Sequence, residues 1–96
     1  MKMKAVEILG LWWKDGCYIT FHTMDGRDGV VHYVTMSEAL IKYGGSFEHY
    51  LGKAFQHADA NNSKLLFDTF GWLFKDYIER FVCVDHPGVF REAVPV

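Results

Sequence analysis

Two Asp-Gly pairs near the N-terminus constrain the fold of this chain more than any other feature. Asp15-Gly16 and Asp25-Gly26 each lie between runs that are rich in β-branched and aromatic residues. An Asp-Gly pair in this setting is the strongest short-range signal for a β-hairpin. The sequence therefore predicts a three-stranded antiparallel β-meander over residues 4–13, 17–24 and 30–36.

The register of the two hairpins decides which side chains share a face, because side chains alternate along a strand with a period of two. In the favoured register, Trp13 lies opposite Cys17 and Met24 lies opposite Val30. The face expected to form the core then carries Leu9, Leu11, Trp13, Cys17, Ile19, Phe21, Val31 and Tyr33. The other, half-polar face carries Val6, Ile8, Trp12, Tyr18, Thr20, His22, His32 and Val34. Two-residue Asp-Gly turns would instead shift each pairing by one residue and mix these sets.

Neighbouring tryptophans cannot both point into the core from one strand, so either Trp12 or Trp13 faces away from the helices. In the favoured register the outward residue is Trp12. Exposed Trp and Tyr side chains are effective anchors in protein interfaces. The residues expected to bind a partner are Trp12, Tyr18, His22, His32 and, on the last helix, Trp72.

The two histidines of the sheet are expected to lie opposite each other across the second hairpin. Cβ atoms of cross-strand neighbours are about 5 Å apart. His22 and His32 could then bind a transition metal together or repel each other when protonated. The favoured interpretation is two polar residues on a solvated face.

Helical patterns begin near residue 36. Thr35 and Glu38 fit a capping box, which predicts a short helix from Met36 to Lys42. Ser46 is expected to cap a second helix. The apolar face of that helix would comprise Phe47, Tyr50, Leu51, Ala54, Phe55 and Ala58.

A third helix is expected over residues 62–82, after a cap formed by residues 59–62. Gly71 costs about 1 kcal/mol relative to alanine in mid-helix, which favours a bend or break there. The apolar residues cover more than one stripe of this helix, so we expect the chain to self-associate or to need a partner. They are Leu65, Leu66, Phe67, Phe70, Trp72, Leu73, Phe74, Tyr77, Ile78 and Phe81.

Together these patterns predict a single α+β domain over residues 1–96. Residues 1–36 form the three-stranded antiparallel β-meander, and residues 37–84 form two or three α-helices packed on one face of it. Residues 85–96 form a turn and a tail that could add an edge strand or lie free.

Charge and composition exclude several classes of protein. The 10 Lys and Arg residues against 12 Asp and Glu residues form no basic stripe, which argues against direct nucleic-acid binding. The apolar runs are too short to span a bilayer, and no signal peptide is recognisable. Two cysteines, Cys17 and Cys83, fit a reducing compartment, so we expect a cytoplasmic protein that does not bind membranes.

Two segments carry groups that could take part in chemistry or bind an ion. Residues 83–86 place a thiol, a carboxylate and an imidazole side by side, but adjacent residues rarely reach catalytic geometry, so a buried cysteine and a turn are favoured. Gly44, Gly45 and Ser46 open a helix and could bind an anion through free N–H groups, although an interhelical hinge is favoured. No set of four zinc ligands has suitable spacing. We therefore expect no catalytic residues, metal or cofactor.

The stretch from Gly44 to Tyr77 resembles small phage- and prophage-encoded proteins of unknown function over about a third of the chain. Those proteins usually have a proline where this chain has Gly71. The residues that carry the resemblance are Gly44-Gly45-Ser46-Phe47, Leu51, Ala54, Ala58-Asp59, Asn62, Leu65 or Leu66, Phe70 and Tyr77. The resemblance implies a mobile-element origin, and small phage proteins often inhibit a host factor, including CRISPR effectors.

These expectations favour a non-catalytic protein-binding module. The resemblance implies a phage- or mobile-element-encoded inhibitor or adaptor, for example a counter-defence protein of the anti-CRISPR type. Its partner would be a host protein, a second copy of the chain, or both. A phage-encoded chain of this kind would act in the host cytoplasm. The alternative is a small-ligand or nucleotide-binding module, with a pocket between sheet and helices or at the Gly44-Gly45 turn.

Overall fold

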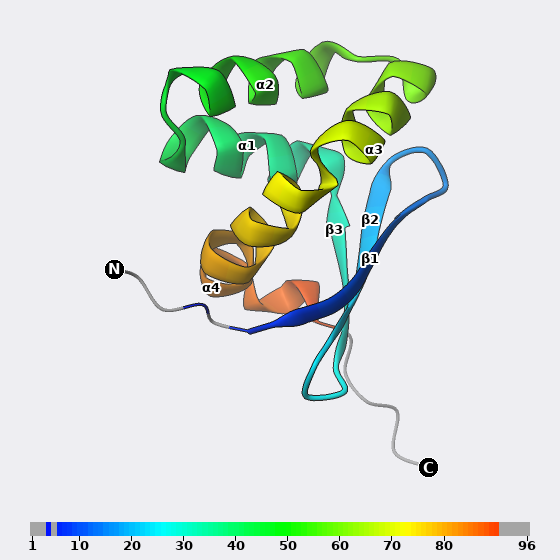
Figure 1. Cartoon of the computed structure of the whole chain (residues 1–96), viewed down its shortest axis with the longest axis vertical. Coiled ribbons are helices and arrows are strands. Elements are labelled where there is room, and N and C mark those ends of the chain that lie inside the picture. Colours follow the sequence, from blue (N-terminus) through cyan, green and yellow to red (C-terminus); the bar gives the residue numbers. More distant parts are fainter. Residues whose placement is uncertain (1–3, 5, 91–96) are drawn as a thin grey trace.

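An antiparallel sheet with the strand order β1-β2-β3 forms one layer of the molecule, and the helices lie on one side of it (Figure 1). The structure is a computed structural model that describes residue 4 and residues 6–90. The strands are β1 (Ile8–Lys14), β2 (Tyr18–Thr23) and β3 (Asp28–His32). The helices that follow are α1 (Tyr33–Tyr43), α2 (Ser46–His57) and α3 (Ala60–Tyr77), then a π-helix (Ile78–Val82), α4 (Cys83–Asp85) and a 3-10 turn (Pro87–Val89). The predicted α+β fold, a meander followed by helices, is confirmed.

The first hairpin turns at Asp15 and Gly16, whose φ angles of 56° and 74° are both positive. The strands then pair Lys14 with Tyr18 and Trp13 with Ile19. The predicted partner of Trp13, Cys17, instead belongs to the turn. Because the error is two residues, it leaves the alternation of faces unchanged, and Trp13 points inward while Trp12 points outward.

A β-bulge between Ile8 and Gly10 reverses this alternation at the start of β1. The prediction placed Leu9 in the core and Val6 and Ile8 on the outer face. In the structure Leu9 is 69% exposed, whereas Val6 and Ile8 are buried. One extra residue in a strand moves every preceding side chain to the other face, and the sequence carries no distinct signal for it.

The second hairpin closes earlier than predicted, with Tyr18 opposite His32 and Phe21 opposite Gly29. The predicted pairing of Met24 with Val30 is wrong. Two hydrogen bonds join Thr23 and Arg27 across the turn. The backbone N–H of Thr23 donates to the carbonyl of Arg27, and the backbone N–H of Arg27 donates to the side-chain hydroxyl of Thr23. Gly29 is needed opposite Phe21, since a Cβ there would lie 2.1 Å from the phenylalanine ring.

Helix α1 starts three residues before the predicted position. His32, the last residue of β3, is its N-cap and accepts a hydrogen bond at Nδ1 from the backbone N–H of Val34, at 3.2 Å. The predicted capping box of Thr35 and Glu38 is therefore wrong, and Tyr33 and Val34 are helical rather than part of a strand. An imidazole nitrogen can cap a helix in the way that a serine hydroxyl does.

Helix α2 packs against α1 through Gly52, where a Cβ would lie only 2.7 Å from the Ser37 carbonyl oxygen. Its buried residues are Leu51, Gly52 and Phe55. The predicted apolar face is therefore partly wrong, because the close approach at Gly52 leaves Phe47 and Tyr50 on the surface. The N-cap is Gly45 rather than Ser46.

Helix α3 begins after Asp59, whose carboxylate accepts from the N–H of Asn62 at 2.8 Å. Its backbone is non-helical at Phe70, with φ −113° and ψ 20°, immediately before Gly71. The predicted bend is thereby confirmed. The turns beyond Tyr77 widen into a π-helix, an arrangement that often accommodates a functional or strained residue.

That π-helix buries Glu79, which is only 2% exposed. One carboxylate oxygen accepts a hydrogen bond from the backbone N–H of Ile8 at 2.7 Å, and the other lies 3.1 Å from Nζ of Lys4. Glu79 therefore attaches the beginning of β1, where the bulge has disturbed the alternation, to the helical layer.

Aromatic rings fill the centre of the core. The rings of Phe55 and Phe74 stack with centroids 5.1 Å apart. Trp13 reaches them from β1, with its ring centroid 5.8 Å from Phe55 and 5.6 Å from Phe67. Trp13 therefore joins the sheet to α2 and α3.

After the 3-10 turn, Phe90 forms a single antiparallel bridge to Gly29 and packs its ring against Phe21, with centroids 5.8 Å apart. The edge strand considered for the tail falls on residues 91–96, which lie outside the described residues. No helix in the described part of the chain has both the length and the apolar character required to cross a membrane.

Candidate binding site on the open face of the sheet

The face of the sheet that points away from the helices carries four of the five residues predicted to bind a partner. Trp12 comes from β1, Tyr18 and His22 come from β2, and His32 ends β3. Trp72, the fifth, lies on the surface of α3 and does not belong to this face. We call the surface formed by Trp12, Tyr18, Thr20, His22, Asp28 and His32 the outer sheet face.

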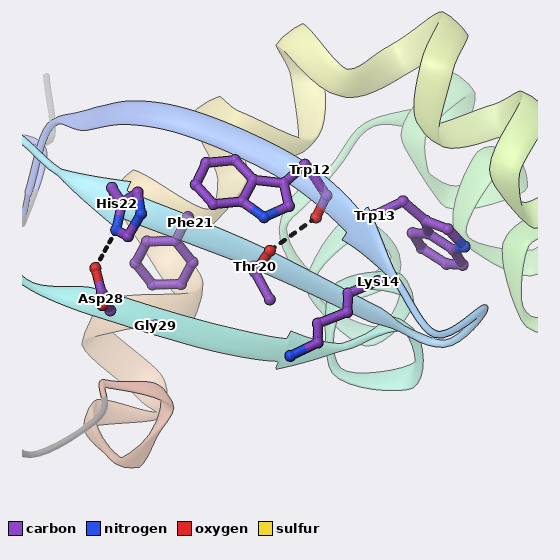
Figure 2. A pocket seen from close by; sticks show the side chains of 8 residues that line it. All are labelled: Trp12, Trp13, Lys14, Thr20, Phe21, His22, Asp28 and Gly29. Atoms are coloured by element: carbon purple, nitrogen blue, oxygen red, sulfur yellow. Dashed lines mark hydrogen bonds and ion pairs between the residues drawn. The ribbon is translucent and has the colours of Figure 1, made fainter.

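Trp12 is held in place by its neighbours on this face although it is 43% exposed. Its ring contacts His22 edge-on, with centroids 4.8 Å apart. The ring also passes 3.0 Å from the position that a Cβ of Gly10 would occupy, so the glycine makes room for it. The hydroxyl of Thr20 donates to the Trp12 carbonyl at 3.3 Å (Figure 2).

His22 pairs with Asp28 across the second hairpin through Nδ1 and Oδ1. Sequence reasoning assigned Asp28 to the turn and therefore missed it. Asp28 lies in a segment rich in Asp and Gly, which is typical of a turn, although in the structure it is the first residue of β3. The carboxylate orients the imidazole, because Nδ1 must carry a proton in order to donate to it.

A hollow of about 230 Å³ lies beside the Trp12 ring. Figure 2 shows Lys14 and Asp28 toward opposite ends of it, while the ring of Trp13 turns away to the helical side. The lining residues are Trp12, Trp13, Lys14, Thr20, Phe21, His22, Asp28 and Gly29. The hollow therefore offers an aromatic wall, one cation and one carboxylate, and it has room for a single large side chain or a small ligand.

His32 lies apart from His22. It pairs with Tyr18, whose ring contacts it edge-on at 5.2 Å, while His22 pairs with Asp28 four residues further along β2. That separation is roughly 13 Å along the strand. The predicted pairing of His22 with His32 is therefore wrong, and the two imidazoles are too far apart to bind one metal ion together. His32 is half-buried and has a structural role as the cap of α1.

The start of α2, where the sequence suggested an anion site, already contacts a carboxylate of the chain. The N–H of Gly45 donates to the Glu48 carboxylate at 2.9 Å, so a negative charge already occupies the helix start formed by Gly44, Gly45 and Ser46. A carboxylate there disfavours a bound anion. Within the described part of the chain, no group of three His, Cys, Asp or Glu side chains is arranged to hold a metal ion.

The segment from Cys83 to His86 does not assemble a nucleophile with its base. Asp85 accepts a hydrogen bond from the Tyr43 hydroxyl and lies 3.5 Å from Nζ of Lys42. These contacts, chiefly the one with Tyr43, lower the pKa of the Asp85 carboxyl. Cys83 is buried, and burial raises the pKa of its thiol to about 11. A thiol of this kind is a poor nucleophile at neutral pH.

We expect Cys83 to resist alkylation in the folded protein. With a pKa of about 11, roughly one Cys83 thiol in a thousand is ionised near pH 8. Deprotonation is easier in the unfolded chain, so the fold loses stability as the pH rises from 9 toward 11. Iodoacetamide labelling followed by mass spectrometry should modify the half-exposed Cys17 first and Cys83 only after unfolding. Equal labelling of both residues in the native state would contradict this assignment.

No family model, curated protein or solved structure matches this chain. The resemblance to phage proteins therefore stays a prediction.

Proposed function

We propose that this protein is a non-catalytic protein-binding module whose outer sheet face receives a segment of a partner protein. The observation that carries the proposal is Trp12, which is well exposed on a face that the helices leave open. Tyr18 adds a second exposed aromatic ring, and polar side chains line the hollow beside Trp12. Aromatic anchors surrounded by polar groups are typical hot spots of protein interfaces.

The dimensions of the outer sheet face suit a loop or a short peptide segment. Three strands of five to seven residues, with a rise of about 3.3 Å per residue and a spacing of about 4.8 Å, cover roughly 250–300 Å² in projection. A standard interface buries about 800 Å² per partner. The hollow beside Trp12 would then receive one large side chain of the partner segment, and affinity would concentrate there.

We further propose that the partner is a host factor and that the protein acts as a phage- or mobile-element-encoded inhibitor or adaptor in the host cytoplasm. This part of the proposal is supported by the resemblance of residues 44–77 to small phage proteins.

Trp12→Ala tests the proposal. We expect it to weaken partner binding at least thirtyfold, because loss of a hot-spot residue costs about 2 kcal/mol or more. The measurement is affinity capture from the host with wild-type and variant protein, followed by titration of the captured partner. Val84→Ala is the matched control, since Val84 is also exposed but lies on α4. Unchanged binding by Trp12→Ala, or equal losses in both variants, would refute the proposal.

A small-ligand module is the second candidate, and the hollow of about 230 Å³ is the observation that favours it. A planar ligand could stack beside Trp12 and pair with Lys14 or Asp28. Failure of the wild-type protein to capture any protein, together with saturable quenching of Trp12 fluorescence by a nucleotide, would favour this candidate.

A further inference from the structure

Helices α2 and α3 expose a second apolar surface that is separate from the outer sheet face. Phe47 is 55% exposed, Tyr50 is 71% exposed and Trp72 is 67% exposed. Leu65 is also exposed, while Leu66 and Phe70 are half-buried. We call this the α2–α3 surface, and its members are Phe47, Tyr50, Ala54, Leu65, Leu66, Phe70 and Trp72.

Two contacts make the α2–α3 surface continuous across the two helices. The rings of Phe47 on α2 and Phe70 on α3 meet edge-on, with centroids 5.6 Å apart. Further along the helices, Ala54 of α2 and Leu65 of α3 line one hollow of about 390 Å³. The surface therefore combines protruding aromatic rings with a hollow lined partly by small residues.

The exposed aromatic rings of the α2–α3 surface supply a substantial part of the area that a stable dimer buries. A fully covered aromatic side chain buries about 150–250 Å², so Phe47, Tyr50 and Trp72 together expose roughly 300–480 Å². These three side chains alone provide about half of the roughly 800 Å² that each partner buries in a standard interface. Leu65, Ala54 and the other residues around the hollow enlarge the surface further.

We propose that a second copy of this chain covers the α2–α3 surface and forms a two-fold symmetric dimer. A two-fold interface uses the same surface on both copies, so that surface must fit itself. The α2–α3 surface meets this requirement, because protruding side chains such as Tyr50 and a hollow wide enough for an aromatic ring lie on it together. A dimer formed in this way leaves Trp12 free on each copy.

Such a dimer would present two outer sheet faces to partners. Linking two binding sites raises the apparent affinity for a partner that is itself multivalent, without any new contact. The dimer does not depend on the proposed function, since the two surfaces share no residue.

Analytical ultracentrifugation of the full chain from micromolar to near-millimolar concentration tests the dimer. We expect wild-type protein to sediment as a dimer and Leu65→Glu to sediment as a monomer, with dimerisation weakened at least thirtyfold, as for loss of an interface hot spot. Tyr50→Ser should weaken dimerisation in the same way. Both residues are exposed in the single chain, so circular dichroism should show a folded monomer in each variant.

Val84→Glu and Trp12→Ala are the controls, because these residues lie on α4 and on the outer sheet face. Both variants should remain dimeric. Wild-type protein that stays monomeric over the whole concentration range would overturn the proposal. The same holds if that monomer binds an added amphipathic helical peptide, because the surface would then serve another partner. Dimers that persist in both Leu65→Glu and Tyr50→Ser would overturn it as well.

Discussion

Replacing Trp13 by alanine is expected to lower the free energy of unfolding by about 3–5 kcal/mol, the range for truncation of a core tryptophan. The ring of Trp13 packs between α2 and α3 and contacts Phe55 and Phe67, so its removal opens a cavity where the sheet meets the helices. For a domain of this size, the loss corresponds to a drop in Tm of roughly 12–30 °C.

The neighbouring Trp12 provides a control of identical chemistry. Its ring lies on the outer sheet face and contacts His22, so Trp12→Ala should cost about 1 kcal/mol or less. Thermal unfolding followed by circular dichroism measures the loss of stability in each variant. All proteins are compared at one concentration, because self-association makes the apparent stability depend on concentration. A larger loss for Trp12 than for Trp13 would show that β1 has the opposite register.

Replacing Glu79 by alanine is expected to lower the free energy of unfolding by about 2–4 kcal/mol. A hydrogen bond to a charged group contributes about 1.5–3 kcal/mol, and the cavity left by the shortened side chain adds to the loss. The change removes the acceptor for the buried N–H of Ile8 and the carboxylate oxygen that lies 3.1 Å from Nζ of Lys4. Hydrogen exchange should therefore show faster opening of the start of β1 than of β2.

Two further variants separate the hydrogen bond from the charge. Glu79→Gln keeps an acceptor for the Ile8 N–H, so it should retain much of the stability that Glu79→Ala loses. Asp68→Ala breaks the exposed pair with Lys64 and should cost less than about 0.5 kcal/mol. Equal, small losses for Glu79→Ala and Asp68→Ala in urea unfolding would show that Glu79 does not hold the start of β1.

Local chemistry allowed much of the fold to be predicted. The Asp-Gly pairs indicated both hairpins, and Asp59 and Gly71 indicated the start of α3 and its bend. These signals depend on backbone angles and hydrogen bonds within a few residues, which a sequence displays directly. The outward position of Trp12 also followed from the sequence, because both hairpin errors were even and left the faces unchanged.

Tertiary contacts decided the features that the sequence did not reveal. The bulge that exposes Leu9, the burial of Glu79 and the approach of α2 at Gly52 each involve groups distant in the sequence. The pairing of His22 with Asp28 depends on a loop length that only the closed hairpin defines. The sequence by itself therefore determined the order of the elements and the outward tryptophan. The folded chain determined the bulge, the close contact of α2 with α1 at Gly52 and the partners of the polar groups, because packing energy depends on which distant surfaces meet.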